Sequence, residues 1–138
     1  MRSVVTRVLA VVVVVLCAVG CGAPAQDAGA AGFMDGTQAV FRFQSVAVGE
    51  VVEGANSFSL VIKRKADDTG VTQAQVSVRV FMPAHAHDSP TTPVVTERGD
   101  GSYDVTNVSF SMPGEWEVTY AVAHAGQEDQ ATFRYTAP

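Results

Sequence analysis

Apolar residues alternate with polar ones, at a period of two residues, through most of the chain beyond residue 38. The alternation runs through four segments, at 57–63, 75–80, 115–122 and 132–135. A period of two places the apolar side chains on one face of an extended chain, whereas a helix needs a period of 3.6. Each segment therefore predicts a half-buried β-strand. The residues expected to face inward are Phe58, Leu60, Ile62, Val76, Val78, Val80, Trp116, Val118 and Tyr120.

Turn residues separate these segments at regular intervals. The triplet Gly99-Asp100-Gly101 lies between apolar segments at 94–97 and 103–108, a pattern that predicts a β-hairpin. Pro113-Gly114 marks another turn, and a further strand is expected near 39–46. About seven short strands at roughly ten-residue spacing predict an all-β fold, an antiparallel immunoglobulin-like β-sandwich.

The N-terminus has the features of a secretory signal. Arg2 and Arg7 precede an apolar run at 8–16, and small residues lead to Cys21. The apolar stretch is shorter than the roughly 20 residues of a membrane-spanning helix, so cleavage is expected. Ala18-Val19-Gly20-Cys21 resembles a bacterial lipobox, which implies a signal peptide at 1–20 and a lipid on Cys21 that attaches the protein to a membrane.

Localisation follows from this resemblance. Gly22 follows Cys21, and without an aspartate there the resemblance implies a lipid-anchored protein of the cell envelope. It would lie on the outer membrane facing the periplasm, or at the cell surface, if the source has two membranes. The small and polar residues at 21–37, Met34 included, are interpreted as a flexible tether, and residues 38–138 as one folded domain.

The cysteine content and the net charge exclude some kinds of chemistry and some partners. Cys17 lies in the signal and Cys21 carries the lipid, so the mature domain has neither a disulfide nor a thiol. Removal of Arg2 and Arg7 changes the formal charge from −5 to −7. An acidic domain is a poor binder of phosphate backbones, so nucleic acid is not an expected partner.

Ligand-type side chains gather at one place, the segment Met82-Pro83-Ala84-His85-Ala86-His87. In an extended backbone His85 and His87 point to the same side, with their bases about 7 Å apart. Imidazole and thioether form a donor set that favours copper over magnesium or calcium. The other interpretation is that these are surface and packing residues on a loop after a strand.

Taken in order, several motifs resemble the YtkA-like domain family, which is related to FixH-type proteins. They lie at 54–58, 74–76, 82–87, 101–103 and 108–116, the last reading Val-Ser-Phe-Ser-Met-Pro-Gly-Glu-Trp. The resemblance implies a small exported β-sandwich and, for some relatives, a link to copper handling or oxidase assembly. The ligands that it implies are Met82, His85, His87 and Met112.

Two functions of different class remain open. The first is a copper-binding chaperone or buffer of the envelope, and the second is a metal-free docking module for an envelope or membrane protein complex. Met112 follows Phe110 at the strand period, so core packing and ligation are both consistent with its position. His124 is expected to be a strand-end histidine, and Asp88 either a hard ligand, a support for His87 or an exposed loop residue. No catalytic motif is present, so an enzyme is not expected.

Overall fold

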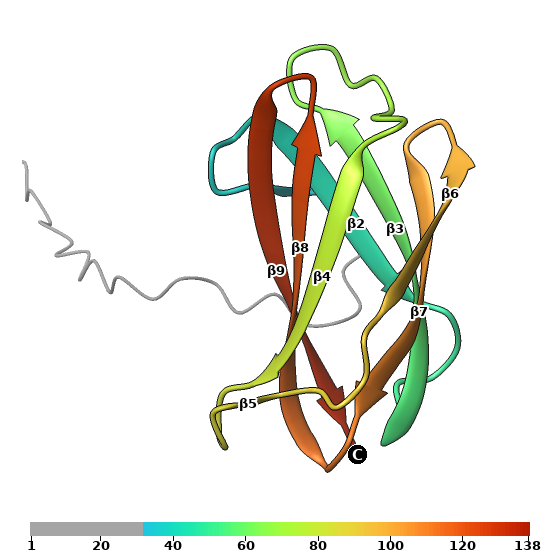
Figure 1. The fold of residues 1–138 in the computed structure, drawn as a ribbon, viewed down its shortest axis with the longest axis vertical. Helices are drawn as coiled ribbons and strands as arrows, with labels where there is room; N and C mark the ends of the chain where they lie inside the picture. Colours follow the sequence, from blue (N-terminus) through green and yellow to red (C-terminus); the bar gives the residue numbers. More distant parts are fainter. Residues whose placement is uncertain (1–31) are drawn as a thin grey trace, which may run out of the picture.

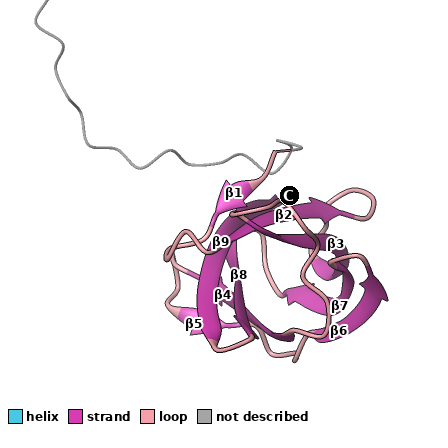
Figure 2. Cartoon of the chain, turned by 90° about the horizontal axis from the view of Figure 1, so that it is seen from above, coloured by secondary structure: helices cyan, strands magenta, loops and turns pink. Residues whose placement is uncertain are grey.

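The part of the chain that the structure describes, residues 32–138, is built from β-strands and turns and contains no helix. This structure is a computed structural model. The signal peptide, Cys21 and most of the tether lie outside the described residues. Two antiparallel sheets pack face to face (Figure 1) and enclose one core (Figure 2), which confirms the predicted β-sandwich. No helix within residues 32–138 is long and apolar enough to cross a membrane.

One sheet has five strands in the order β1-β2-β3-β7-β6, and the other has four in the order β5-β4-β8-β9. The nine strands are β1 Met34–Asp35, β2 Phe41–Ala47, β3 Gly54–Arg64, β4 Gln75–Met82, β5 His87–Asp88, β6 Val94–Gly99, β7 Ser102–Phe110, β8 Gly114–His124 and β9 Gln127–Ala137. Seven of these are six residues or longer, and the two that the sequence did not predict, β1 and β5, have two residues each.

The seven longer strands have the arrangement of an immunoglobulin constant domain. If they are lettered A to G in chain order, one sheet reads A-B-E-D and the other C-F-G. The hairpin predicted around Gly99-Asp100-Gly101 is present between β6 and β7. All three turn residues have positive φ, from 52° to 100°, which explains why glycine occupies two of the positions.

The core is formed by the alternating residues that the sequence singled out. Seven of the nine residues expected to face inward are buried, and Val76 and Val78 are partly buried against the same cluster. Trp116 lies in the core with no exposed surface and stacks on Phe110, with 5.4 Å between the ring centroids. Aromatic side chains from β2, β3 and β7 complete the core on the other sheet: Phe41, Phe43, Phe58, Tyr103 and Phe110.

The fold begins before residue 38, the start predicted for the domain. Met34, expected in the tether, pairs with Phe43 in β1–β2, and Thr37 donates a backbone hydrogen bond to the Gln130 carbonyl of β9. The period-two pattern is too short here to reveal a two-residue strand. Residues 34–37 are therefore part of the sandwich.

The register places the strand ends at two poles. At the pole drawn lowest in Figure 1, β4 ends at Met82, β7 ends at Phe110 and β8 begins at Gly114. We call this the lower pole and define it by the loops at 48–53, 83–86 and 111–113. The upper pole carries the turns at 100–101 and 125–126.

Candidate metal centre

The Met-Pro-x-His-x-His segment forms a tight turn at the lower pole. Residues 83–86 connect β4 to β5, and the turn is closed by hydrogen bonds from His85 N to Met82 O and from Ala86 N to Pro83 O, each 3.3 Å. Pro83 has no N–H to continue the ladder and favours the second position of such a turn. Ala86 has φ of 52°. The backbone at His85 is therefore part of a turn and is not extended, because the chain reverses direction between Met82 and His87.

His87 faces into the sandwich. It lies directly opposite Met82 in the β4–β5 ladder, and residues paired in this way share one face of the sheet. Its ring meets Trp116 edge-on, with 5.5 Å between centroids and 72° between planes. His87 Nδ1 lies 3.1 Å from the Asp88 carbonyl oxygen. A carbonyl can only accept, so in the neutral imidazole Nδ1 carries the proton and Nε2 has the lone pair for a ligand.

His85 lies on the exposed side of the same turn, with its ring centroid 6.2 Å from that of His87. A metal–nitrogen bond is about 2.0 Å and the nitrogen lies about 1.2 Å from its ring centroid, so two imidazoles on one ion have centroids up to about 6.4 Å apart. The separation of the two rings is just below this upper limit, which applies when the two nitrogens lie on opposite sides of the ion. The turn therefore places the two imidazole rings close together, although the backbone is not extended.

The two methionines differ in burial. Met82 is only 2% exposed and belongs to the core, with its terminal methyl 2.7 Å from the position that a Cβ on Gly114 would occupy. Met112 is partly buried against the core, and its carbonyl accepts the Trp116 Nε1–H at 3.1 Å. Both sulfur-bearing side chains therefore border the turn at 111–113, and Met112 is the more accessible of the two.

The other histidine and the loop aspartate have different surroundings. His124 ends β8 at the upper pole, as expected for a strand-end residue, and its Nε2 lies 3.1 Å from a nitrogen of Arg64. The guanidinium can only donate, so this nitrogen of His124 accepts. The Asp88 carboxylate points to the outer face, where it accepts a hydrogen bond from Arg79 Nε at 2.7 Å.

The donor set at the lower pole depends on sulfur. Within residues 32–138 no group of three or more His, Cys, Asp or Glu side chains is placed to hold a metal. A metal here would have two imidazoles, with thioether sulfur as the remaining side-chain donor. Such a set suits copper, and especially Cu(I), better than the hard cations.

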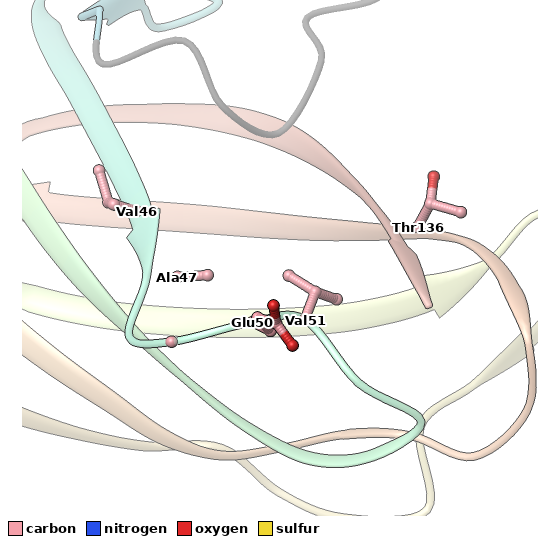
Figure 3. A pocket seen from close by; sticks show the side chains of 6 residues that line it. Val46, Ala47, Glu50, Val51 and Thr136 are labelled. Carbon is pink, nitrogen blue, oxygen red and sulfur yellow. The ribbon is translucent and has the colours of Figure 1, made fainter. Parts of the chain in front are cut away.

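A second feature of this pole is apolar. Val46, Val48 and Val52, in and beside the 48–53 loop, are exposed, Val48 by 67%. A pocket of about 510 Å³ lies here and is lined by Val46, Ala47, Gly49, Glu50, Val51 and Thr136. Figure 3 shows five of these residues around it with labels: Val46, Ala47, Glu50, Val51 and Thr136. The loop also carries Glu50 and Glu53 and has no basic residue.

Two residues next to the candidate ligands were not identified as such from the sequence. Trp116 was assigned to the core, which is correct, but it also forms the wall behind His87. Arg79 looked like an ordinary outward residue of a strand, yet it contacts Asp88. Only the pairing of β4 with β5 and β8 reveals these contacts, because the partners are 9 or more residues apart.

Comparison with known proteins gives a family and a fold. A family model described as YtkA-like matches residues 37–121, which include both histidines and Met112. Among solved structures, a copper-bound variant of FetP from uropathogenic Escherichia coli strain F11 has a similar fold. The TM-score is 0.53 at 9% identity, over 78% of this chain and 95% of that chain. No curated protein matches the chain.

Proposed function

Since this chain belongs to the YtkA-like family, we propose that it is a non-catalytic copper-binding protein of the cell envelope, acting as a chaperone or buffer. His85 and His87 supply the nitrogen ligands. Met112, or Met82 after a rearrangement of its packing, supplies sulfur. The observation that carries the proposal is the 6.2 Å separation of the two imidazole centroids at the pole where both methionines lie.

Two further points support copper. His87 has its Nδ1 engaged with a backbone carbonyl, an arrangement common among metal-binding histidines, which leaves Nε2 for the ion. The FetP variant that shares this fold is a copper-bound protein. When bound, copper would be held by the two imidazoles and a thioether, while the protein supplies an orienting wall through Trp116.

The proposed anchor is a lipid on Cys21, which would keep the domain at the outer membrane or cell surface. Cys21 and Phe33 are twelve positions apart in the sequence, and an extended segment of that length spans up to about 40 Å. Mass spectrometry of the purified protein is expected to show a lipidated N-terminal Cys21. An unmodified cysteine, or a mature chain that begins elsewhere, would refute the anchor without affecting the copper site.

Copper binding is tested by titrating the full-length protein with Cu(I) and Cu(II), using competing chelators. Fluorescence reports binding directly, because the chain has one tryptophan and its ring lies 5.5 Å from His87. We expect one ion to bind and to quench Trp116. The His85→Ala/His87→Ala variant should lose most of the affinity.

The matched control is His124→Ala, which removes the third histidine at the opposite pole and should bind copper as the parent does. Met112→Leu should weaken Cu(I) more than Cu(II), because Cu(I) prefers thioether sulfur. If the double-histidine variant binds as tightly as the parent, the copper proposal is wrong.

The metal-free docking module is favoured by one separate observation, the exposed valines of the 48–53 loop. Exposed apolar side chains gathered at one pole are a feature of contact surfaces. This second function becomes the better one if the parent protein shows no copper binding above that of an unrelated acidic protein.

A further inference from the structure

Two short contacts on the outer face of β4 join Phe81, Arg79 and Asp88, the residue that follows His87. The guanidinium of Arg79 lies over the Phe81 ring, 4.4 Å from its centroid, and Arg79 Nε donates to the Asp88 carboxylate at 2.7 Å. Arg79 and Phe81 are two apart in a strand and so share one face, and Asp88 lies opposite Phe81 in the ladder. The three side chains therefore form one stack, Phe81–Arg79–Asp88.

This stack contributes little to stability, but it ends at the residue whose carbonyl contacts His87. The side chains of Arg79 and Asp88 are 61% and 58% exposed, and ion pairs so exposed have little effect on folding. The carbonyl of Asp88 is the acceptor for His87 Nδ1 at 3.1 Å. The peptide that carries this carbonyl donates its Ser89 N–H to the Val80 carbonyl at 2.8 Å, and the pair with Arg79 fixes the Asp88 side chain next to it, in a strand of only two residues.

The inner side of His87 is fixed as well. Its ring contacts Trp116 edge-on, and Trp116 in turn donates its Nε1–H to the Met112 carbonyl. His85, by contrast, is exposed on the turn. The two histidines thus differ: His87 contacts the Asp88 carbonyl and Trp116, whereas His85 is exposed to solvent.

We infer that Arg79 is a positioning residue, which holds the Asp88 carbonyl so that His87 keeps its proton on Nδ1 and presents Nε2 as the preset ligand. The part of this inference that concerns copper affinity rests on the proposed function. The part that concerns the tautomer of His87 in the metal-free protein is independent of it.

The test uses the full-length protein labelled with nitrogen-15 at histidine, which gives only three imidazole spin systems. In the metal-free parent at alkaline pH, the ring nitrogen shifts of His87 should show the Nδ1–H tautomer. Arg79→Ala should move His87 towards the Nε2–H tautomer and lower copper affinity about tenfold, the usual effect of removing a partner behind a metal ligand.

The matched control is Arg98→Ala, which removes the comparably exposed pair of Arg98 with Asp104 near the upper pole. It should change neither the His87 spectrum nor copper affinity. An unchanged His87 tautomer in Arg79→Ala, or an Nε2–H tautomer in the parent, overturns the inference even if copper binds. A tautomer shift in a protein that binds no copper overturns the proposed function and leaves the role of Arg79 standing.

Discussion

At the scale of single residues, Asp129 links the first residues of the fold to its last strand through several backbone hydrogen bonds. Its carboxylate is buried in β9 and accepts backbone N–H groups from Gln38, Val40, Phe41 and Gln130 at 2.7–3.0 Å. Burial raises the pKa of Asp129, but these donors together outweigh it, so the pKa lies below its ordinary value. The ionised carboxylate therefore ties the start of the sandwich to its last strand.

We expect Asp129→Asn to lower the free energy of unfolding by about 2–3 kcal/mol at neutral pH, since an amide offers fewer acceptors to the same donors. A depressed folded-state pKa contributes stability above the unfolded-state value of about 3.9, and the contribution is lost as pH falls through the lower folded value. The difference between variant and parent in urea unfolding should thus shrink in acid. Asp68→Asn, at an exposed carboxylate, is the control, and a constant difference across this pH range would contradict the assignment.

Gly114 combines two constraints at the turn into β8. Its φ is 128°, and a Cβ there would lie 2.7 Å from the terminal methyl of Met82. We expect Gly114→Ala to cost about 2–4 kcal/mol in chemical denaturation, from backbone strain and from displacing a packed side chain. Gly49→Ala is the matched control, because its φ is 93° with no atom within 4 Å of the Cβ. Equal losses in the two variants would show that the contact with Met82 carries no cost.

At the scale of elements, a buried hydroxyl cluster joins β2 to β8 and β9. Ser45 Oγ lies 2.8 Å from Tyr120 Oη and accepts from Tyr135 Oη at 2.6 Å. Burial raises the pKa of Tyr120, and it raises the pKa of Tyr135 to about 12. The three hydroxyls satisfy one another where water is excluded, so each strand depends on the other two for its buried polar group.

Ser45→Ala should lower the free energy of unfolding by about 1–3 kcal/mol, since it removes one buried hydrogen-bond partner from each of Tyr120 and Tyr135. In a Tyr120→Phe background the same substitution should cost at least about 0.5 kcal/mol less, which a double-mutant cycle in urea measures. The exposed hydroxyl pair of Thr119 and Thr132 provides the control, because water replaces that bond when Thr119→Ala removes it. Additive losses at Ser45 and Tyr120 would argue against the cluster.

At the scale of the whole molecule, the folded unit includes residues that look like a tether. Asp35 pairs with Lys65, Gly36 donates its backbone N–H to Phe41, and Thr37 bonds to β9. A chain that begins at residue 38 loses all of these. It should be less stable than one that begins at residue 32, by about 1–3 kcal/mol, the sum of a few backbone hydrogen bonds. Identical urea midpoints would mean that this segment adds nothing to the sandwich.

Much of the fold and part of the candidate site were predictable from the sequence. The alternation of Phe58, Leu60 and Ile62 predicts which face is buried, because it depends only on neighbours in the chain. The candidate site at Met82, His85 and His87 could be identified because these ligand-type residues lie within six positions of the sequence. The geometry of the segment could not be predicted in the same way, because the turn at 83–86 replaces an extended backbone there.

The sequence by itself determined the seven longer strands, most of their inward faces, the hairpin at Gly99-Asp100-Gly101 and the gathering of histidines beside a methionine. These features are local, so propensity and period are enough to specify them. Only the tertiary structure decided that His87 faces Met82 and Trp116, that Arg79 supports Asp88, and that Asp129 holds the first residues of the fold. Each of these contacts depends on which strands pair and in what register, and pairing is settled by packing between segments far apart in the chain.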